Sequence, residues 1–109
     1  MASTYKVLAQ VNPSATTATT AYTCGSASGA VVSTISVCNQ SGTAGSYRIA
    51  IRPAGATLDP KHYIAYDVSI AGNDTTALTL GITLANTDVV TVYASASTMS
   101  FNLYGTELS

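Results

Sequence analysis

Charged side chains are scarce in this sequence. Asp, Glu, Lys and Arg make up 8% of the 109 residues, whereas soluble domains average about 25%. The four basic residues, Lys6, Arg48, Arg52 and Lys61, are scattered along the chain. Nucleic-acid binding requires several phosphates to be neutralised on one surface, so the sequence argues against a nucleic-acid partner.

Long apolar runs are also missing. No run approaches the roughly 18 residues that a membrane-spanning helix needs, so no membrane partner is expected. The stretch from Met1 to Lys6 has no basic segment followed by an apolar core, and we therefore expect no signal peptide. The chain is expected to be made in, and at first to stay in, a cytoplasm.

Residue types that bind metals or perform catalysis are few. His62 is the one histidine, and with Cys24 and Cys38 it falls short of the four ligands of a structural zinc site. We expect His62 to be a surface or loop histidine beside Pro60. Asp74 and Asp88 lie in turn clusters, where a short acceptor satisfies nearby backbone N–H groups. No Gly-x-Ser-x-Gly elbow is present. The sequence therefore predicts no enzyme, no catalytic residues, no metal site and no cofactor.

No disulfide is expected between the two cysteines. Cytoplasmic thiols stay reduced by default. If residues 25–29 form a hairpin turn, Cys24 lies opposite about residue 30, and Cys38 lies roughly 26 Å further along, at about 3.3 Å per residue. A disulfide needs Cα atoms within about 7 Å. A disulfide remains possible only if the chain crosses between two sheets at this point.

Hydroxyl side chains take the place of the missing charges. The chain contains 13 Ser and 17 Thr. Thr and Val suit strands, because a β-branched carbon packs well on a pleated sheet. Strong helix formers such as Glu, Lys and Met are rare, so the composition favours an all-β protein.

Strand patterns recur at short intervals, separated by turn clusters. The expected strands span residues 5–11, 19–23, 30–39, 46–53, 62–70, 75–84, 89–94 and 100–104. Short connections imply antiparallel pairing. We therefore predict a single domain, residues 1–109, folded as an antiparallel β-sandwich of about eight strands, jelly-roll or immunoglobulin-like. Residues 1–20 are weakly patterned, so an extended N-terminal arm remains an alternative to a first strand.

Strict alternation assigns side chains to faces. In 46–53 it places Tyr47, Ile49 and Ile51 inward and the two arginines outward. In 62–70 it groups Ile64, Tyr66, Val68 and Ile70, opposite Tyr63, Ala65 and Asp67. In 75–84 it groups Leu78, Leu80, Ile82 and Leu84.

A contact patch for another protein is one interpretation of the outward arginines. Its members would be Arg48, Arg52, Tyr63 and Tyr66, with Tyr93 beside them. Arg and Tyr are enriched at interfaces, because each offers a large contact area and a polar group. In the alternative, Arg48 and Arg52 pair with Asp67 on the sheet exterior. The sequence leaves both open.

Six stretches together resemble a known family. They are residues 34–39, 46–51, 62–67, 78–84, 88–94 and 101–107. The chain resembles small virion proteins of tailed phages, notably of cyanophages, over nearly its whole length. The resemblance implies a structural virion protein, assembled in the host cytoplasm, that binds the major capsid protein as a cement or decoration protein. Such proteins are typically homotrimeric β-sandwiches. The family has no active-site motif, so the resemblance assigns no functional residue.

The composition suits a cement protein. A nearly uncharged surface loses little solvation when a shell covers it, and Ser and Thr hydroxyls can hydrogen-bond across a wet interface. Three linked subunits raise apparent affinity without new contacts. The alternative is a neck, tail or fibre accessory module with carbohydrate or host-surface recognition, in which Tyr63, Tyr66 or Tyr93 would lie beneath sugar rings.

Overall fold

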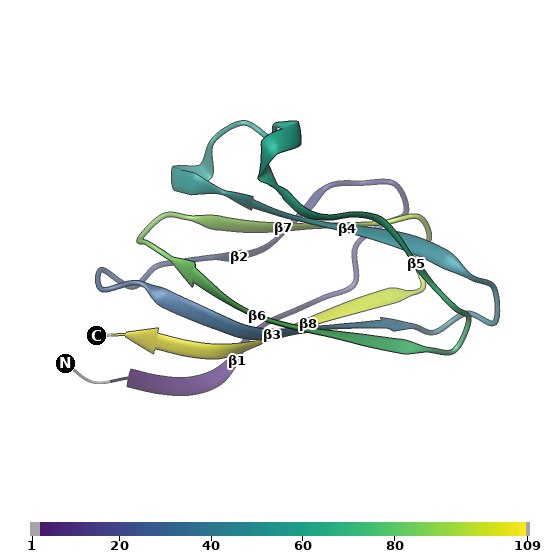
Figure 1. The fold of residues 1–109 in the computed structure, drawn as a ribbon, viewed down its shortest axis with the longest axis horizontal. Coiled ribbons are helices and arrows are strands. Elements are labelled where there is room, and N and C mark those ends of the chain that lie inside the picture. The colour runs from purple at the N-terminus through teal and green to yellow at the C-terminus, as the bar shows by residue number, and fades with distance from the viewer. Residues whose placement is uncertain (1–2, 109) are drawn as a thin grey trace.

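The structure is a computed structural model that describes residues 3–108. Eight antiparallel strands form two four-stranded sheets, packed face to face as a sandwich (Figure 1). The strands are β1 (Ser3–Val11), β2 (Thr19–Thr23), β3 (Ala30–Asn39), β4 (Gly45–Arg52), β5 (Tyr63–Ile70), β6 (Thr75–Leu84), β7 (Val89–Ala94) and β8 (Met99–Leu108). Two short 3-10 turns, η1 (Pro53–Gly55) and η2 (Pro60–His62), lie between β4 and β5. The expected all-β sandwich is confirmed.

The strand order identifies the architecture as a jelly roll. One sheet has the order β1-β8-β3-β6 and the other has the order β2-β7-β4-β5. Strands pair as β1 with β8, β2 with β7, β3 with β6 and β4 with β5. This pairing is that of one long antiparallel hairpin, whose paired arms are bent and wrapped around a core. Of the two expected architectures, the jelly roll is therefore present and the immunoglobulin order is not.

The N-terminal segment is a strand and not an arm. β1 pairs with β8 from Ser3 opposite Leu108 to Val11 opposite Phe101. Residues 12–18 then cross to the other sheet, where β2 pairs with β7. The arm alternative is therefore wrong for residues 3–20, and residues 1–2 lie outside the described part of the chain.

The core lies between the two sheets. Most of its fully buried side chains come from β3 and β8 on one side and from β4 and β7 on the other, among them Val32, Ile35, Val37, Phe101, Leu103, Tyr47, Ile49, Val90 and Val92. The rings of Tyr47 and Phe101 meet edge to face, with centroids 6.2 Å apart. This contact joins β4 to β8 across the sandwich.

The cysteines are both free, but the hairpin assumed for residues 25–29 is wrong. β2 and β3 belong to different sheets, so the chain does cross there. The carbonyl of Cys24 accepts a hydrogen bond from the Thr87 N–H, near the end of the sandwich where β3 begins at Ala30. Cys38 lies eight positions further along β3, roughly 26 Å from that end at about 3.3 Å per residue. Distance along β3 therefore prevents the disulfide even though the chain crosses between sheets.

Register shifts occur at one level across the sheet β1-β8-β3-β6. Relative to β8, both β1 and β3 contain an extra residue, Leu8 and Ser33 respectively. β6 contains another near Gly81, which has a φ of 61°. At this level β3 presses on β8, because a Cβ at Gly105 would overlap the carbonyl of Val31. The bulge in β6 leaves Leu80 exposed, so its expected grouping with the inward residues of that strand is wrong.

Asn39 is a buried polar side chain that joins several loops at one end of the sandwich. Its Nδ2 donates to the carbonyls of Thr43 and Ala71, at 2.9 and 3.3 Å. Its Oδ1 accepts from the Ser41 N–H and from the Thr98 hydroxyl, at 3.1 and 3.2 Å. One amide therefore satisfies groups from three connections that are distant in the sequence.

Removing that amide is expected to destabilise the fold. We expect Asn39→Ala to lower the free energy of unfolding by about 2–3 kcal/mol, because four part-buried hydrogen bonds are lost together. The matched control is Gln40→Ala, at an exposed neighbour whose side chain makes one long hydrogen bond to Ser100. Denaturant unfolding measures both. An equal, small effect for the two variants would contradict this role.

A polar cluster connects the two sheets near the start of β1. The Lys6 ammonium lies 2.7 Å from Glu107 Oε1, and the Tyr22 hydroxyl donates to Glu107 Oε2 at 2.5 Å. Lys6 and Glu107 belong to β1 and β8, and Tyr22 belongs to β2 of the other sheet. The hydrogen bonds from Lys6 and then Tyr22 lower the pKa of Glu107. Burial, followed by the hydrogen bond to Glu107, raises the pKa of Tyr22.

The lowered pKa of Glu107 makes stability sensitive to acid. The ionised carboxylate stabilises the fold above its unfolded pKa of about 4.3, and this contribution is lost as the pH falls through the lower folded value. Denaturant unfolding between about pH 3 and pH 7 should show stability falling below about pH 4.3. Glu107→Gln should flatten that fall, whereas Asp74→Asn should not. A Glu107→Gln profile parallel to that of the unmodified protein would refute the link.

Candidate functional site

A bulge in β5 brings the predicted patch residues around Arg48. Val68 pairs with Tyr47 and Ala65 pairs with Ile49, so two residues of β5 lie opposite Arg48. These two residues are Tyr66 and Asp67.

Asp67 has a φ of 50°, in the left-handed region. Asp adopts that region more readily than most residues. Strict alternation would send Tyr66 and Asp67 to opposite faces, but the bulge lets both reach Arg48. The expected grouping of Ile64, Tyr66, Val68 and Ile70 on one face is therefore wrong.

We call Arg48, Tyr66, Asp67 and Tyr93 the Arg48 cluster. Arg48 Nε donates to Asp67 Oδ1 at 2.6 Å, and Nη2 lies 3.4 Å from Oδ2. The Arg48 Cζ atom lies 4.2 Å from the ring centroids of both Tyr66 and Tyr93. Contacts of this kind attract the cation to the negative faces of the rings. The guanidinium is thus fixed by three neighbours from β5 and β7.

A groove adjoins the Arg48 cluster through Tyr66. Its lining residues are Leu58, Asp59, Pro60, Tyr63 and Tyr66, and its volume is about 590 Å³. We call it the tyrosine groove. The rings of Tyr63 and Tyr66 meet edge to face, with centroids 4.9 Å apart. The groove lies between the β4–β5 connection and the outer face of the sheet β2-β7-β4-β5.

The turn η2 forms a fixed wall of this groove. Asp59 Oδ1 accepts from the Lys61 N–H at 3.2 Å, and His62 Nδ1 accepts from the Asp59 N–H at 3.1 Å. His62 is 8% exposed, so the expected surface position is wrong, whereas its position in the β4–β5 connection agrees with the loop alternative. The sequence signal that could have located it is the Asp-Pro pair three and two positions before it, which is typical of a capped turn.

Arg52 does not join the patch. Its Nε donates to the Thr91 hydroxyl at 3.0 Å, and its Nη1 donates to the carbonyl of Ala56 at 3.0 Å. Its side chain therefore holds the β4–β5 connection against β7. The structure brings Arg48, Tyr63, Tyr66 and Tyr93 together on one surface. Pairing with Asp67 is confirmed for Arg48 and is wrong for Arg52.

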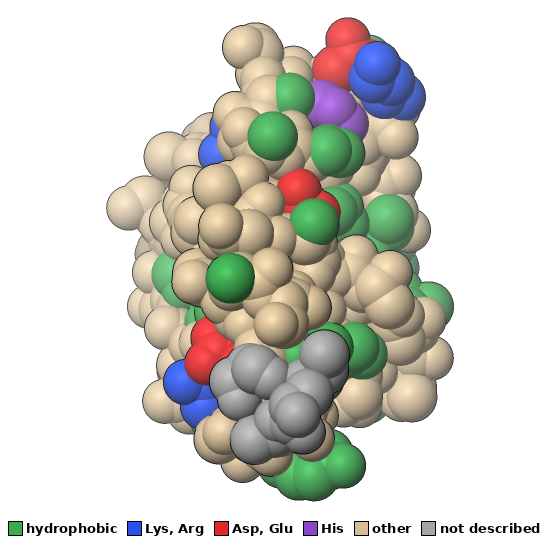
Figure 2. All heavy atoms as spheres, turned by 90° about the vertical axis from the view of Figure 1, so that its left-hand side faces the viewer, with side chains coloured by type: hydrophobic (Ala, Val, Ile, Leu, Met, Phe, Trp, Pro, Cys, Tyr) green, Lys and Arg blue, Asp and Glu red, His purple; other side chains and the backbone are tan. Residues whose placement is uncertain are grey.

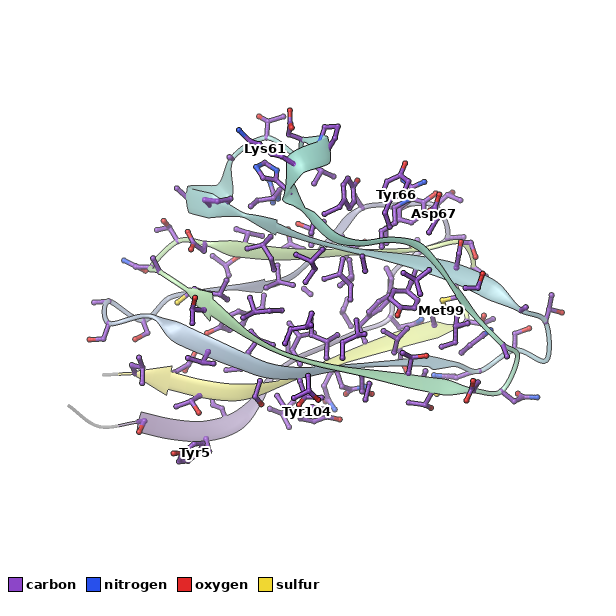
Figure 3. The ribbon with its side chains drawn as sticks, viewed as in Figure 1. Tyr5, Lys61, Tyr66, Asp67, Met99 and Tyr104 are labelled. Atoms are coloured by element: carbon purple, nitrogen blue, oxygen red, sulfur yellow. The ribbon has the colours of Figure 1, made fainter. Side chains whose placement is uncertain are left out.

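A second surface was not identified from the sequence. On the outer side of β1 and β8, Tyr5, Val7 and Tyr104 are 82%, 48% and 38% exposed. Val7 and Tyr104 are cross-strand partners. Figure 3 shows Tyr5 and Tyr104 projecting from their sheet away from the other sheet. We call the outer side of the sheet β1-β8-β3-β6 the neutral face.

Within residues 3–108, no charged side chain lies on the neutral face. β3 and β6 contain no Asp, Glu, Lys or Arg. Lys6 alternates with Tyr5 and Val7, and Glu107 reaches across to Tyr22, so both point to the inner side. At one end of the sandwich, Figure 2 shows charged side chains only as small, separate groups on an otherwise uncharged surface.

The acidic residues serve local structure. Asp88 Oδ2 accepts from the Ala85 N–H and its Oδ1 accepts from the Ala54 N–H, both at 2.9 Å. Asp74 Oδ1 accepts from the Thr75 N–H at 2.9 Å, so the expected role of both turn aspartates is confirmed. Among residues 3–108, no three His, Cys, Asp or Glu side chains lie together as a metal site would require.

No match is found among protein-family models, curated proteins or solved structures. Within residues 3–108, none of the helices is long and apolar enough to span a membrane. Function is therefore inferred from the two surfaces themselves: the Arg48 cluster with its groove on one sheet, and the neutral face on the other.

Replacing Asp67 tests whether its backbone conformation builds the Arg48 cluster. We expect Asp67→Val to cost about 1–2 kcal/mol more than Asp67→Asn, because a β-branched residue is strained at positive φ and Asn is not. Thermal or denaturant unfolding of the two variants gives the difference. Equal stabilities would show that the bulge does not depend on this conformation.

Proposed function

We propose that this chain is a structural virion protein that binds the major capsid protein and stabilises the phage shell as a cement or decoration protein. The observation that supports it most directly is the neutral face. An exposed sheet surface with no charged side chain and with two outward tyrosines is suited to being covered by another protein.

The energetics of covering the neutral face favour adhesion. Burying an unpaired charge is costly, and this surface has none to bury. Tyr5 and Tyr104 supply large apolar areas with a hydroxyl at the tip, the kind of side chain that dominates interface energies. Thr106 and Thr34 on the neighbouring strands can hydrogen-bond through ordered water. The surface therefore gains contacts without a large solvation cost.

The irregular edge strands favour binding of a partner protein to the face of a sheet over strand addition at its edge. Register shifts interrupt the ladders of all four edge strands, β1, β2, β5 and β6. Bulges of this kind discourage a neighbouring chain from adding a strand. The jelly roll is also a recurrent fold of viral capsid domains, which supports the proposal by analogy.

The size of the neutral face favours several copies acting together. Four strands about 4.8 Å apart and about nine residues long cover roughly 600 Å². A standard protein interface buries about 800 Å² on each partner. A homotrimer would present three such faces at once and raise the apparent affinity for the shell.

The alternative of a neck, tail or fibre module that binds sugars receives less support. Sugar stacking needs an open ring face. The Arg48 guanidinium lies over the rings of both Tyr66 and Tyr93, so at most one face of each ring is left for a sugar. These tyrosines are better suited to contacts with a protein surface.

A charge placed on the neutral face tests the proposal. We expect Val7→Lys to weaken binding to shells of the corresponding major capsid protein at least tenfold, about 1.4 kcal/mol, because an unpaired ammonium would be buried. The matched control is Ile64→Lys on β5 of the other sheet, since Ile64 and Val7 are similarly exposed at 43% and 48%.

Co-sedimentation of purified protein with shells measures both affinities. The expected result is loss of binding for Val7→Lys and near-normal binding for Ile64→Lys. Absence of shell binding by the unmodified protein would refute the cement function. Equal binding by the two variants would refute the assignment of the neutral face.

A further inference from the structure

We propose that the tyrosine groove is a binding site for a basic side chain, an arginine or a lysine, presented by a partner protein. The site lies on the sheet opposite the neutral face, so it does not depend on the cement function and can be occupied while the neutral face is covered.

The lining of the groove selects for a cation. Its side chains are two tyrosine rings, Leu58, Pro60 and the carboxylate of Asp59. Within residues 3–108, Asp59 forms no ion pair, and its contacts are hydrogen bonds in its own turn. An aromatic surface next to an unpaired carboxylate attracts a cation through the ring quadrupoles and through charge.

Lys61 is the nearest basic residue in sequence, but it does not fill the groove. It is exposed on the turn η2 and does not line the cavity. Figure 3 places Lys61 at the top of the view, apart from Tyr66 and Asp67. The carboxylate of Asp59 therefore remains available to a cation from outside.

The Arg48 cluster shows the same chemistry already satisfied within the chain. There, the rings of Tyr66 and Tyr93 and the Asp67 carboxylate hold a guanidinium. The groove repeats those residue types with Tyr63, Tyr66 and Asp59, and Tyr66 is common to both. No basic side chain is among the residues that line the groove, and its volume of about 590 Å³ is ample for an arginine or lysine side chain.

Other ligand classes fit the lining less well. An anion would be repelled by Asp59, with no basic side chain in the lining to offset it. An aliphatic ligand would bury the carboxylate without a partner, which is costly. A neutral sugar could use the same ring face but would gain no charge attraction from Asp59.

The groove is also preorganised. Asp59 and His62 close the turn η2 by reciprocal hydrogen bonds. Arg52 holds the preceding loop through the carbonyls of Gly55 and Ala56, and Asp88 holds Ala54. A wall that is already ordered loses little conformational freedom on binding, so more of the contact energy appears as affinity.

NMR titration of the isotope-labelled protein tests the site. The probes are N-acetylarginine methylamide, its neutral analogue N-acetylglutamine methylamide, and methyl glucoside. We expect the arginine probe to give saturable shifts at Asp59, Tyr63 and Tyr66 and to bind at least tenfold more tightly than the other two. Affinity should fall as salt is added, because the attraction is partly electrostatic.

Two variants locate the interaction. Asp59→Asn keeps the turn-capping oxygen and removes the charge, and we expect it to weaken the arginine probe at least threefold. Tyr63→Leu keeps the carboxylate and removes the ring, and it should weaken binding similarly. Asp74→Asn, in a distant turn, should leave binding unchanged.

The proposal fails if the glutamine probe or the glucoside binds as tightly as the arginine probe. It also fails if neither groove variant weakens the arginine probe, or if the shifts map elsewhere. Shell binding is measured separately, so loss of the cement function and loss of the groove function are distinguishable: a protein that binds shells but ignores the arginine probe would refute only the groove.

Discussion

The bulges in the edge strands determine which side chains this sandwich presents. In a regular strand alternate residues face the core, and an extra residue interrupts that alternation. In β5 the extra residue places Tyr66 and Asp67 together beside Arg48. In β6 another exposes Leu80. The same shifts interrupt the edges, so the molecule offers faces for contact instead of strand ends.

The two faces have different chemistry. The neutral face combines tyrosines with threonine hydroxyls and has no charge, which suits a broad contact with little solvation cost. The opposite sheet concentrates cation–π and carboxylate contacts around Arg48 and the tyrosine groove. The neutral face and the tyrosine groove lie on the outer sides of the two packed sheets. A chain attached to a shell through the neutral face would therefore direct its groove away from that shell.

The fold was largely predictable from the sequence, and the site was predictable only in part. Period-two patterning located all eight strands, because each is bounded by turn residues. It failed at Tyr66 and Leu80, where Asp67 and Gly81 adopt positive φ and add a residue. The pairing of Arg48 with Asp67 was one of the sequence-based alternatives. The different role of Arg52 was not predicted, because the carbonyl groups that accept its hydrogen bonds lie in a loop without a strand pattern. His62 was missed because a capped turn buried it.

Imaging of the intact phage particle would locate this chain and the sheet through which it is attached. A cryo-electron microscopy reconstruction that resolves strands would show where the chain is bound and which sheet faces the shell. We expect density for the chain on the head, with Tyr5 and Tyr104 against the major capsid protein and the tyrosine groove facing outward. Density at the neck or tail, or a head-bound chain whose neutral face is open to solvent, would contradict it.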